Sequence, residues 1–205
     1  YKEFLDKVGH DKAYLLMHTD PKDPNGQDLE AIAKELGLSR ENLGISNGKV
    51  PPQVMAQFYN AADCTINISD AEGFGLSVLE SLSCGTPVIV NKTGGMQDQT
   101  IGENGEEFGI VIKPASRAII GSQEVPYIYE DRVSGDDVVN AMITIHNMPR
   151  EQRKALGKKG LEHVQKNFSF EQYGKSWDRI LQEVHEKCGS WETRKNYKSW
   201  TLEEI

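Results

Sequence analysis

Between residues 13 and 91, short apolar segments alternate with segments of helical periodicity. In DLEAIAKELG the apolar residues recur at i, i+3, i+4 and i+7, which is the spacing of an amphipathic helix. KAYLLMHT is instead a short apolar run, typical of a buried strand. The alternation continues through NLGISNGKV, PPQVMAQFYNAA, DCTINIS, LSVLESLSCG and TPVIVN. It predicts an α/β fold with a Rossmann-like parallel sheet and helices on both faces, because parallel strands need crossover connections.

Composition narrows the class of protein. The net charge of −8 argues against nucleic-acid binding, which needs a basic face. The best apolar run, AYLLM, is far shorter than the ~20 residues of a membrane span, so we expect no transmembrane segment. The three cysteines form no C-x-x-C pair, and the histidines lie at no metal-ligand spacing. These features predict a reducing compartment, the cytoplasm, and no structural zinc.

The stretch DAEGFGLSVLES, residues 70–81, has the glycine spacing of a loop that approaches a phosphate. We expect a strand to end at Ser69, the glycines to turn the chain, and a helix to begin near Leu76. The first N–H groups of a helix lack partners within it, and with the helix dipole they form an anion site. Glycine at positions 73 and 75 permits φ > 0 and a close backbone approach. The N–H groups expected to face the anion are those of Phe74, Gly75, Leu76 and Ser77.

Two carboxylates flank this loop, although carboxylates repel phosphate. Glu80 lies about one turn into the expected helix, where it could accept hydrogen bonds from neighbouring hydroxyls, as an acidic residue does with ribose in dinucleotide folds. Glu72 precedes the turn, where it could meet a hexose hydroxyl or developing positive charge. A nucleoside diphosphate joined to a sugar fits both halves, since its hydroxyl-rich ends meet carboxylates and its charged centre meets N–H groups.

Other interpretations of these residues exist. The two glutamates could be solvent-exposed capping charges, or they could hold Mg²⁺, although no third oxygen ligand is evident nearby. A dinucleotide fingerprint fails, because the third glycine position after Gly73 and Gly75 is Val78,. DPKDPNG resembles a calcium loop, but with Gly26 at the sixth position that loop would close at Ile32, so a turn is expected there.

The run EGFGLSVLE followed by SLSCGTPVIVNKTGG resembles the C-terminal, donor-binding domain of retaining, family-4-like (group 1) GT-B glycosyltransferases. AQFYNAADCTINIS resembles the helix and strand that precede this motif, and the resemblance covers residues 13 to 187. It implies two Rossmann-like domains facing across a cleft. The reaction implied is transfer of a hexose from a UDP- or GDP-sugar to an unknown acceptor, with retention and without a metal or cofactor.

The same resemblance implies roles for individual residues. Glu72 would be catalytic, contacting the donor hexose and stabilising an oxocarbenium-like transition state. Glu80 would bind the ribose diol, and Lys49 and Val50 would hold the base, mostly through their backbone. The remaining residues implied to bind substrate are Gly73, Phe74, Gly75, Leu76 and Ser77.

One departure from that family concerns the start of the chain. The family's diphosphate-binding Arg and Lys follow a first strand that would lie upstream of Tyr1, as would the acceptor domain. We therefore expect a nucleotide-sugar-binding domain over residues 1–187, a tail over 188–205, a missing N-terminal domain as partner, and an inactive isolated chain. The alternatives are a non-catalytic nucleotide-sugar-binding or interaction module, and another GT-B enzyme such as an epimerase.

The remaining segments carry weaker signals. The excursion from Lys113 to Val133 is expected to be an exposed loop, although four of its side chains could line the cleft. These side chains are Arg117, Tyr127, Tyr129 and Arg132. Helices are expected over 136–148, with Asp136 as cap, and over 150–166. A capping box from Ser169 to Gln172 opens a last helix. Its expected buried stripe consists of Tyr173, Trp177, Ile180, Leu181 and Val184. Aromatic residues of the tail could pack on the missing domain or belong to a frayed end: Trp191, Tyr197 and Trp200.

Overall fold

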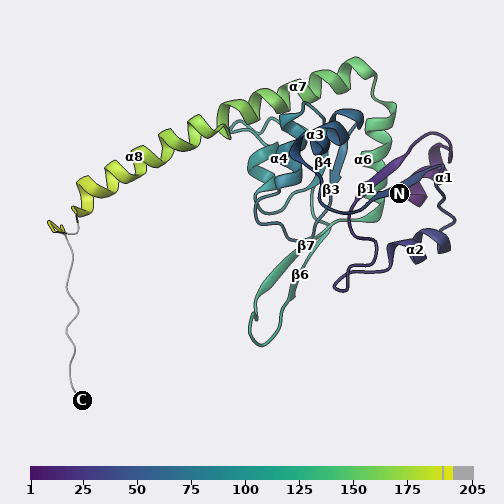
Figure 1. Cartoon of the computed structure of the whole chain (residues 1–205), viewed down its shortest axis with the longest axis horizontal. Coiled ribbons are helices and arrows are strands. Elements are labelled where there is room, and N and C mark those ends of the chain that lie inside the picture. Colours follow the sequence, from purple (N-terminus) through teal and green to yellow (C-terminus); the bar gives the residue numbers. More distant parts are fainter. Residues whose placement is uncertain (191, 196–205) are drawn as a thin grey trace. The chain divides into compact units, whose positions relative to one another are not determined.

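The computed structural model describes residues 1–190 and 192–195 (Figure 1). Trp191, Tyr197 and Trp200, the tail aromatics considered above, lie outside the described residues. The chain divides into two compact units, the first comprising residues 1–163 and the second residues 164–205.

The first unit is built on parallel strands joined by helices, which confirms the predicted α/β class. β1 (Leu15–His18) pairs with β2 (Leu43–Ser46) in one parallel sheet. A second parallel sheet has the order β3 (Thr65–Asn67), β4 (Val88–Asn91) and β5 (Ile110–Ile112). The helices of this unit are α1 (Lys2–Val8), α2 (Leu29–Glu35), α3 (Pro52–Ala61), α4 (Leu76–Ser83), α5 (Met96–Thr100), α6 (Gly135–Asn147) and part of α7 (Arg150–Asn167).

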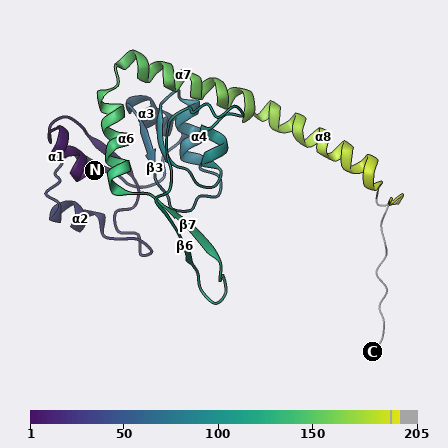
Figure 2. The same ribbon diagram turned by 180° about the vertical axis from the view of Figure 1, so that it is seen from behind.

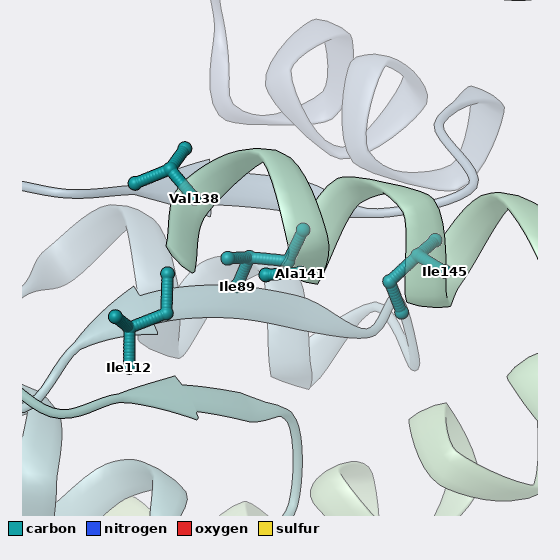
Figure 3. Close-up of a cluster of buried hydrophobic side chains, with 5 residues drawn as sticks. All are labelled: Ile89, Ile112, Val138, Ala141 and Ile145. Atoms are coloured by element: carbon teal, nitrogen blue, oxygen red, sulfur yellow. The ribbon is translucent and has the colours of Figure 1, made fainter. Parts of the chain in front are cut away.

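Helices cover both faces of the three-stranded sheet. Side chains alternate between the two faces of a strand, and on β3 the Thr65 hydroxyl contacts Ser81 of α4 while Ile66 packs against the cluster under α6. Figure 3 shows this cluster, in which α6 lies against β4 and β5. Its buried members are Ile89, Ile112, Val138, Ala141 and Ile145. The sheet is therefore held from both sides, and the carboxyl ends of its strands are left for loops.

The two-stranded sheet is less well covered than the sequence suggested. The sequence predicts a buried strand at β1, but its residues alternate between partly buried and exposed, and Leu16 is 45% exposed. An apolar run of four residues does not distinguish a strand covered on one face from one covered on both. Among the described residues, β1 pairs only with β2 and β3 only with β4, so each sheet has an unpaired edge.

The excursion from Lys113 to Val133 is not an irregular loop. It contains an antiparallel hairpin of β6 (Ser116–Ile120) and β7 (Ile128–Arg132), seen as a two-stranded ribbon in Figure 2. The turn between the strands is closed by hydrogen bonds from the amides of Glu124 and Val125 to the Ser122 hydroxyl. The sequence did not indicate these strands because most of their side chains are exposed, so no buried face produced an alternating pattern.

Two further expectations needed correction. The N-cap of α6 is Ser134, whose hydroxyl accepts from the Asp137 amide, whereas Asp136 lies inside the first turn. In the second unit, Ser169 is the N-cap of α8 (Phe170–Cys188), as predicted, and its hydroxyl accepts from the Gln172 amide. Its apolar stripe is exposed rather than buried, because helical periodicity specifies an apolar face but not what covers it,. The exposed members are Tyr173, Trp177, Ile180, Leu181 and Val184.

Candidate functional site

The loop between β3 and α4, residues 68–75, is called here the first glycine loop. It ends at Gly75, which caps α4 in the left-handed conformation (φ 90°, ψ 53°) and has no side chain with which to cap the helix. The amides of Val78 and Leu79 donate to the Gly75 carbonyl. Among the hydrogen bonds of the described residues, none engages the amides of Leu76 or Ser77. These two amides at the start of α4 therefore have no hydrogen-bond partner among the described residues, and their binding of an anion remains a prediction,.

Of the two glycines of this loop, only Gly75 is required by its backbone conformation and its neighbours. At Gly75 the positive φ strains any other residue, and a Cβ would lie 2.9 Å from Cγ of Met96. Gly73 does not have a positive φ, and a Cβ there would meet nothing within 4 Å. The expectation of φ > 0 at both positions is thus correct at Gly75 and wrong at Gly73. Among the described residues, no atom would lie within 4 Å of a Cβ at position 73, so no contact there requires glycine.

A second glycine loop, residues 92–95, holds the first loop in place. The Gly95 amide donates to the Gly73 carbonyl at 3.2 Å. The backbones approach so closely that a Cβ on Gly94 would lie 1.6 Å from the carbonyl oxygen of Glu72. From α5, the buried Gln99 donates through Nε2 to the Phe74 carbonyl at 2.6 Å. Gln99 was not singled out from the sequence, and only its position after the TGG motif could have suggested it.

Glu80 is fixed by a tyrosine that sequence reasoning missed. The hydroxyl of Tyr59, on α3, donates to Oε2 of Glu80 at 2.9 Å. Tyr59 is buried whereas Glu80 is exposed, so the carboxylate sits at the edge of the core. Burial raises the pKa of Tyr59, and the hydrogen bond to the Glu80 carboxylate raises it further. A buried tyrosine hydroxyl needs a hydrogen-bond partner, and this requirement is the feature from which the contact with Glu80 could have been predicted.

Glu72 lies in the first glycine loop and is partly buried. Its Cγ is 3.6 Å from where a Cβ on Gly75 would stand, so the side chain lies next to the bend. Neither Glu72 nor Glu80 belongs to an ion pair among the described residues. In the sequence, two carboxylates without an ion-pair partner among the described residues therefore stand before and after the start of α4, which has no side-chain cap.

Lys49 and Val50 lie in the loop that joins β2 to α3. Lys49 is exposed and Val50 partly buried. No hydrogen bond or ion pair described for the chain joins either residue to the first glycine loop. The connection runs through α3, which begins just after Val50 and carries Tyr59. The structure thus places Glu72 next to the bend at Gly75 and joins Glu80 to Tyr59, and the roles of these residues, like those of Lys49 and Val50, remain predictions.

In the part of the chain that the structure describes, no group of three or more His, Cys, Asp or Glu side chains is arranged to hold a metal ion. No described helix combines the length and apolar character needed to cross a membrane. Metal independence remains a prediction.

Known proteins share this fold. Sucrose-phosphate synthase from Thermosynechococcus elongatus superposes with a TM-score of 0.61 at 20% identity, covering 91% of this chain and 49% of that protein. Anabaena HepE, in complex with UDP and glucose, gives a TM-score of 0.61 at 14% identity, covering 89% of this chain and 52% of that protein. Likeness at these identities concerns the fold, and it defines the class as a GT-B glycosyltransferase fold.

Part of the sequence is also similar to a family of known proteins. Residues 22–120 match the family described as glycosyl transferases group 1. A D-inositol 3-phosphate glycosyltransferase from Corynebacterium jeikeium is 32% identical over 113 residues, which are 54% of this chain and 26% of that protein. Over these residues the chain is similar to the group 1 glycosyltransferases. The aligned residues are about a quarter of that curated relative.

Proposed function

We propose that this chain binds the nucleotide-diphosphate sugar of a hexosyltransferase and that the complete protein transfers the hexose with retention. The observation that carries the proposal is the uncapped start of α4 at Gly75, flanked by Glu72 and Glu80. Free N–H groups at a helix start favour a diphosphate. The neighbouring carboxylates suit the hydroxyl-rich ends of the same ligand. HepE, which has this fold, was solved with UDP and glucose.

In this proposal the residues divide the work. The amides of Leu76 and Ser77 bind the diphosphate, and the open space beside Gly73 lets the ligand approach closely. Glu80 accepts hydrogen bonds from the ribose diol through the oxygen that Tyr59 leaves available. Glu72 stabilises the positive charge that develops at the anomeric carbon, since fixed charges act strongly where charge forms in the transition state. Lys49 and Val50 contact the base, and no cofactor or metal takes part.

The separation of the parallel strands into two sheets, β1–β2 and β3–β4–β5, supports a further part of the proposal. β1 and β3 each leave one edge unpaired among the described residues. We propose that the complete protein supplies a strand to these edges, with basic diphosphate-binding residues after it, and an N-terminal acceptor domain. The activity then belongs to the complete protein, with the isolated chain inactive. The acceptor and the base, uracil or guanine, are left open, and the cytoplasmic location remains a prediction.

A non-catalytic nucleotide-sugar-binding module is the second candidate. It requires the same diphosphate site but no function for Glu72. It would bind the donor and release no free nucleotide in the presence of any acceptor.

A panel of nucleotides and nucleotide sugars, screened by thermal shift on the complete protein, tests the proposal. UDP- or GDP-sugars should raise the melting temperature more than adenine or cytidine analogues do, by linkage to binding. Release of nucleotide from the best ligand then separates a transferase from a binding module. An absence of stabilisation by every diphosphate in the panel would reject the site.

A further inference from the structure

The β6–β7 hairpin is joined to both glycine loops through a single residue, Asp131. Its amide donates to the carbonyl of Asp70, in the first loop, at 2.7 Å. The side-chain Nδ2 of Asn91, at the end of β4, donates both to the Asp131 carbonyl and to the Ser69 carbonyl. The backbone of Asp131 thus contacts both the first glycine loop and the end of β4. It lies beyond residues 22–120, which match the family.

The side chain of Asp131 makes a second set of contacts. Oδ2 accepts from the hydroxyl of the buried Thr93, in the second glycine loop, at 2.9 Å, and Oδ1 accepts from Nε of Arg117, on β6, at 2.8 Å. The Asp131 side chain is 14% exposed. Hydrogen bonds from Arg117 and then from Thr93 hold the pKa of Asp131 below its ordinary value. One largely covered carboxylate therefore ties the hairpin to the loop that supports Gly73.

The neighbouring carboxylate on β7 provides a contrast. Glu130 also pairs with an arginine, accepting from Nε and Nη2 of Arg132 at 3.0 and 2.7 Å. Both partners of that pair lie on the same strand of the hairpin. If the acids served only to stabilise the hairpin, Asp131 would not need to reach Thr93.

We propose that Asp131 is a positioning residue for the transfer reaction, acting through Thr93 to hold the second glycine loop against the first. This inference rests on the proposed function of the site. A fixed second loop keeps the Gly95 amide on the Gly73 carbonyl, which sets the backbone beside Glu72 before the donor binds. Pre-formed geometry lowers the cost of reaching the transition state.

The test uses the complete protein and four variants: Asp131→Asn, Thr93→Val, Thr93→Ser and Glu130→Gln. Two quantities are measured, namely kcat and KM for the nucleotide-sugar donor, and the hydrogen-exchange rate of the Gly95 amide. Asp131→Asn and Thr93→Val should each lower kcat/KM about tenfold, which corresponds to the free energy of one hydrogen bond to a charged group. The Gly95 amide should exchange correspondingly faster. Glu130→Gln should match the wild type in both measurements.

The two threonine variants distinguish positioning from packing. Valine keeps the shape of threonine but loses the hydroxyl, whereas serine keeps the hydroxyl and loses a methyl group. Serine should therefore retain activity and exchange rate, and valine should not. The reverse order, or an Asp131→Asn variant indistinguishable from Glu130→Gln, would overturn the proposal. A wild-type protein that transfers no sugar would reject the proposed function, while the exchange rates would still decide the role of Asp131.

Discussion

The hydroxyl of Tyr59 donates a 2.9 Å hydrogen bond to Oε2 of Glu80 and so joins α3 to α4 beside the uncapped helix start. The tyrosine is buried and also fixed by its backbone, since the Thr86 hydroxyl donates to its carbonyl at 2.8 Å. A long, exposed glutamate would otherwise sample several rotamers. The contact holds the Glu80 carboxylate in one place and leaves its other oxygen for a ligand.

Removing this hydroxyl should weaken nucleotide binding. Tyr59→Phe keeps the ring in the core but frees Glu80, so the dissociation constant for the preferred nucleotide should rise about fivefold, corresponding to the ~1 kcal/mol of a typical hydrogen bond. Calorimetric titration of the complete protein measures the change. Tyr173→Phe, at an exposed position of α8, is the matched control and should bind as the wild type does. Equal affinities for Tyr59→Phe and wild type would refute a role for this contact.

The same tyrosine predicts a dependence of stability on pH. Burial and the Glu80 carboxylate raise the pKa of Tyr59 above its ordinary 10.0. The folded state then holds the phenolic proton more tightly than the unfolded state, so the stabilisation is complete below pH 10 and declines as pH rises above it. Denaturant unfolding at about pH 8 and about pH 11 should show a smaller stability difference between wild type and Tyr59→Phe at the higher pH. A difference that stays constant or widens would contradict the assignment.

The two glycines of the first loop should respond differently to alanine. Gly75→Ala places a Cβ at positive φ and 2.9 Å from Met96, and should lower the free energy of unfolding by about 1–3 kcal/mol,. Gly73→Ala meets open space, and should alter stability by less than about 0.5 kcal/mol,. Its methyl group should nevertheless obstruct the diphosphate and weaken binding. Unfolding curves and calorimetry on both variants check this, and normal donor binding by Gly73→Ala would mean that the ligand does not approach there.

Glu72 and Glu80 should divide catalysis and binding between them. Glu72→Gln removes charge where the transition state needs it, so kcat should fall about 100-fold while KM for the donor changes little. Glu80→Gln should mainly raise the donor KM. Glu103→Gln, an exposed glutamate in a turn, is the control and should change neither. Steady-state kinetics on the complete protein distinguish these patterns, and a Glu72 variant with normal kcat would remove that residue from the chemistry.

Local patterns in the sequence were sufficient for much of the fold. The parallel strands follow from short apolar runs between amphipathic helices, and the start of α4 at Leu76 follows from the glycines that precede it. These features depend on neighbouring residues and on backbone conformation. The sequence therefore predicted the turn at Gly75 and the helix that follows it, whereas the functions of Glu72 and Glu80 remain predictions.

Contacts between distant residues could not be predicted in the same way. Tyr59 and Glu80 are 21 positions apart, and Thr93 and Asp131 are 38 apart, so no periodic pattern connects them. The β6–β7 hairpin was not predicted because most of its side chains are exposed, so its sequence shows no alternation of apolar and polar residues. On α8 the apolar stripe at Trp177 was recognised, but its burial depends on a covering surface that the helix sequence does not specify.

The central claim is that the start of α4 binds the diphosphate of the donor. A ¹⁵N-labelled protein titrated with UDP and GDP tests this directly, because the chemical shift of an amide changes when it donates to a phosphate. The signals of Leu76 and Ser77 should shift most, together with those of the first glycine loop. If a nucleotide binds while the signals of Leu76 and Ser77 stay unchanged, the diphosphate lies elsewhere and the account is wrong.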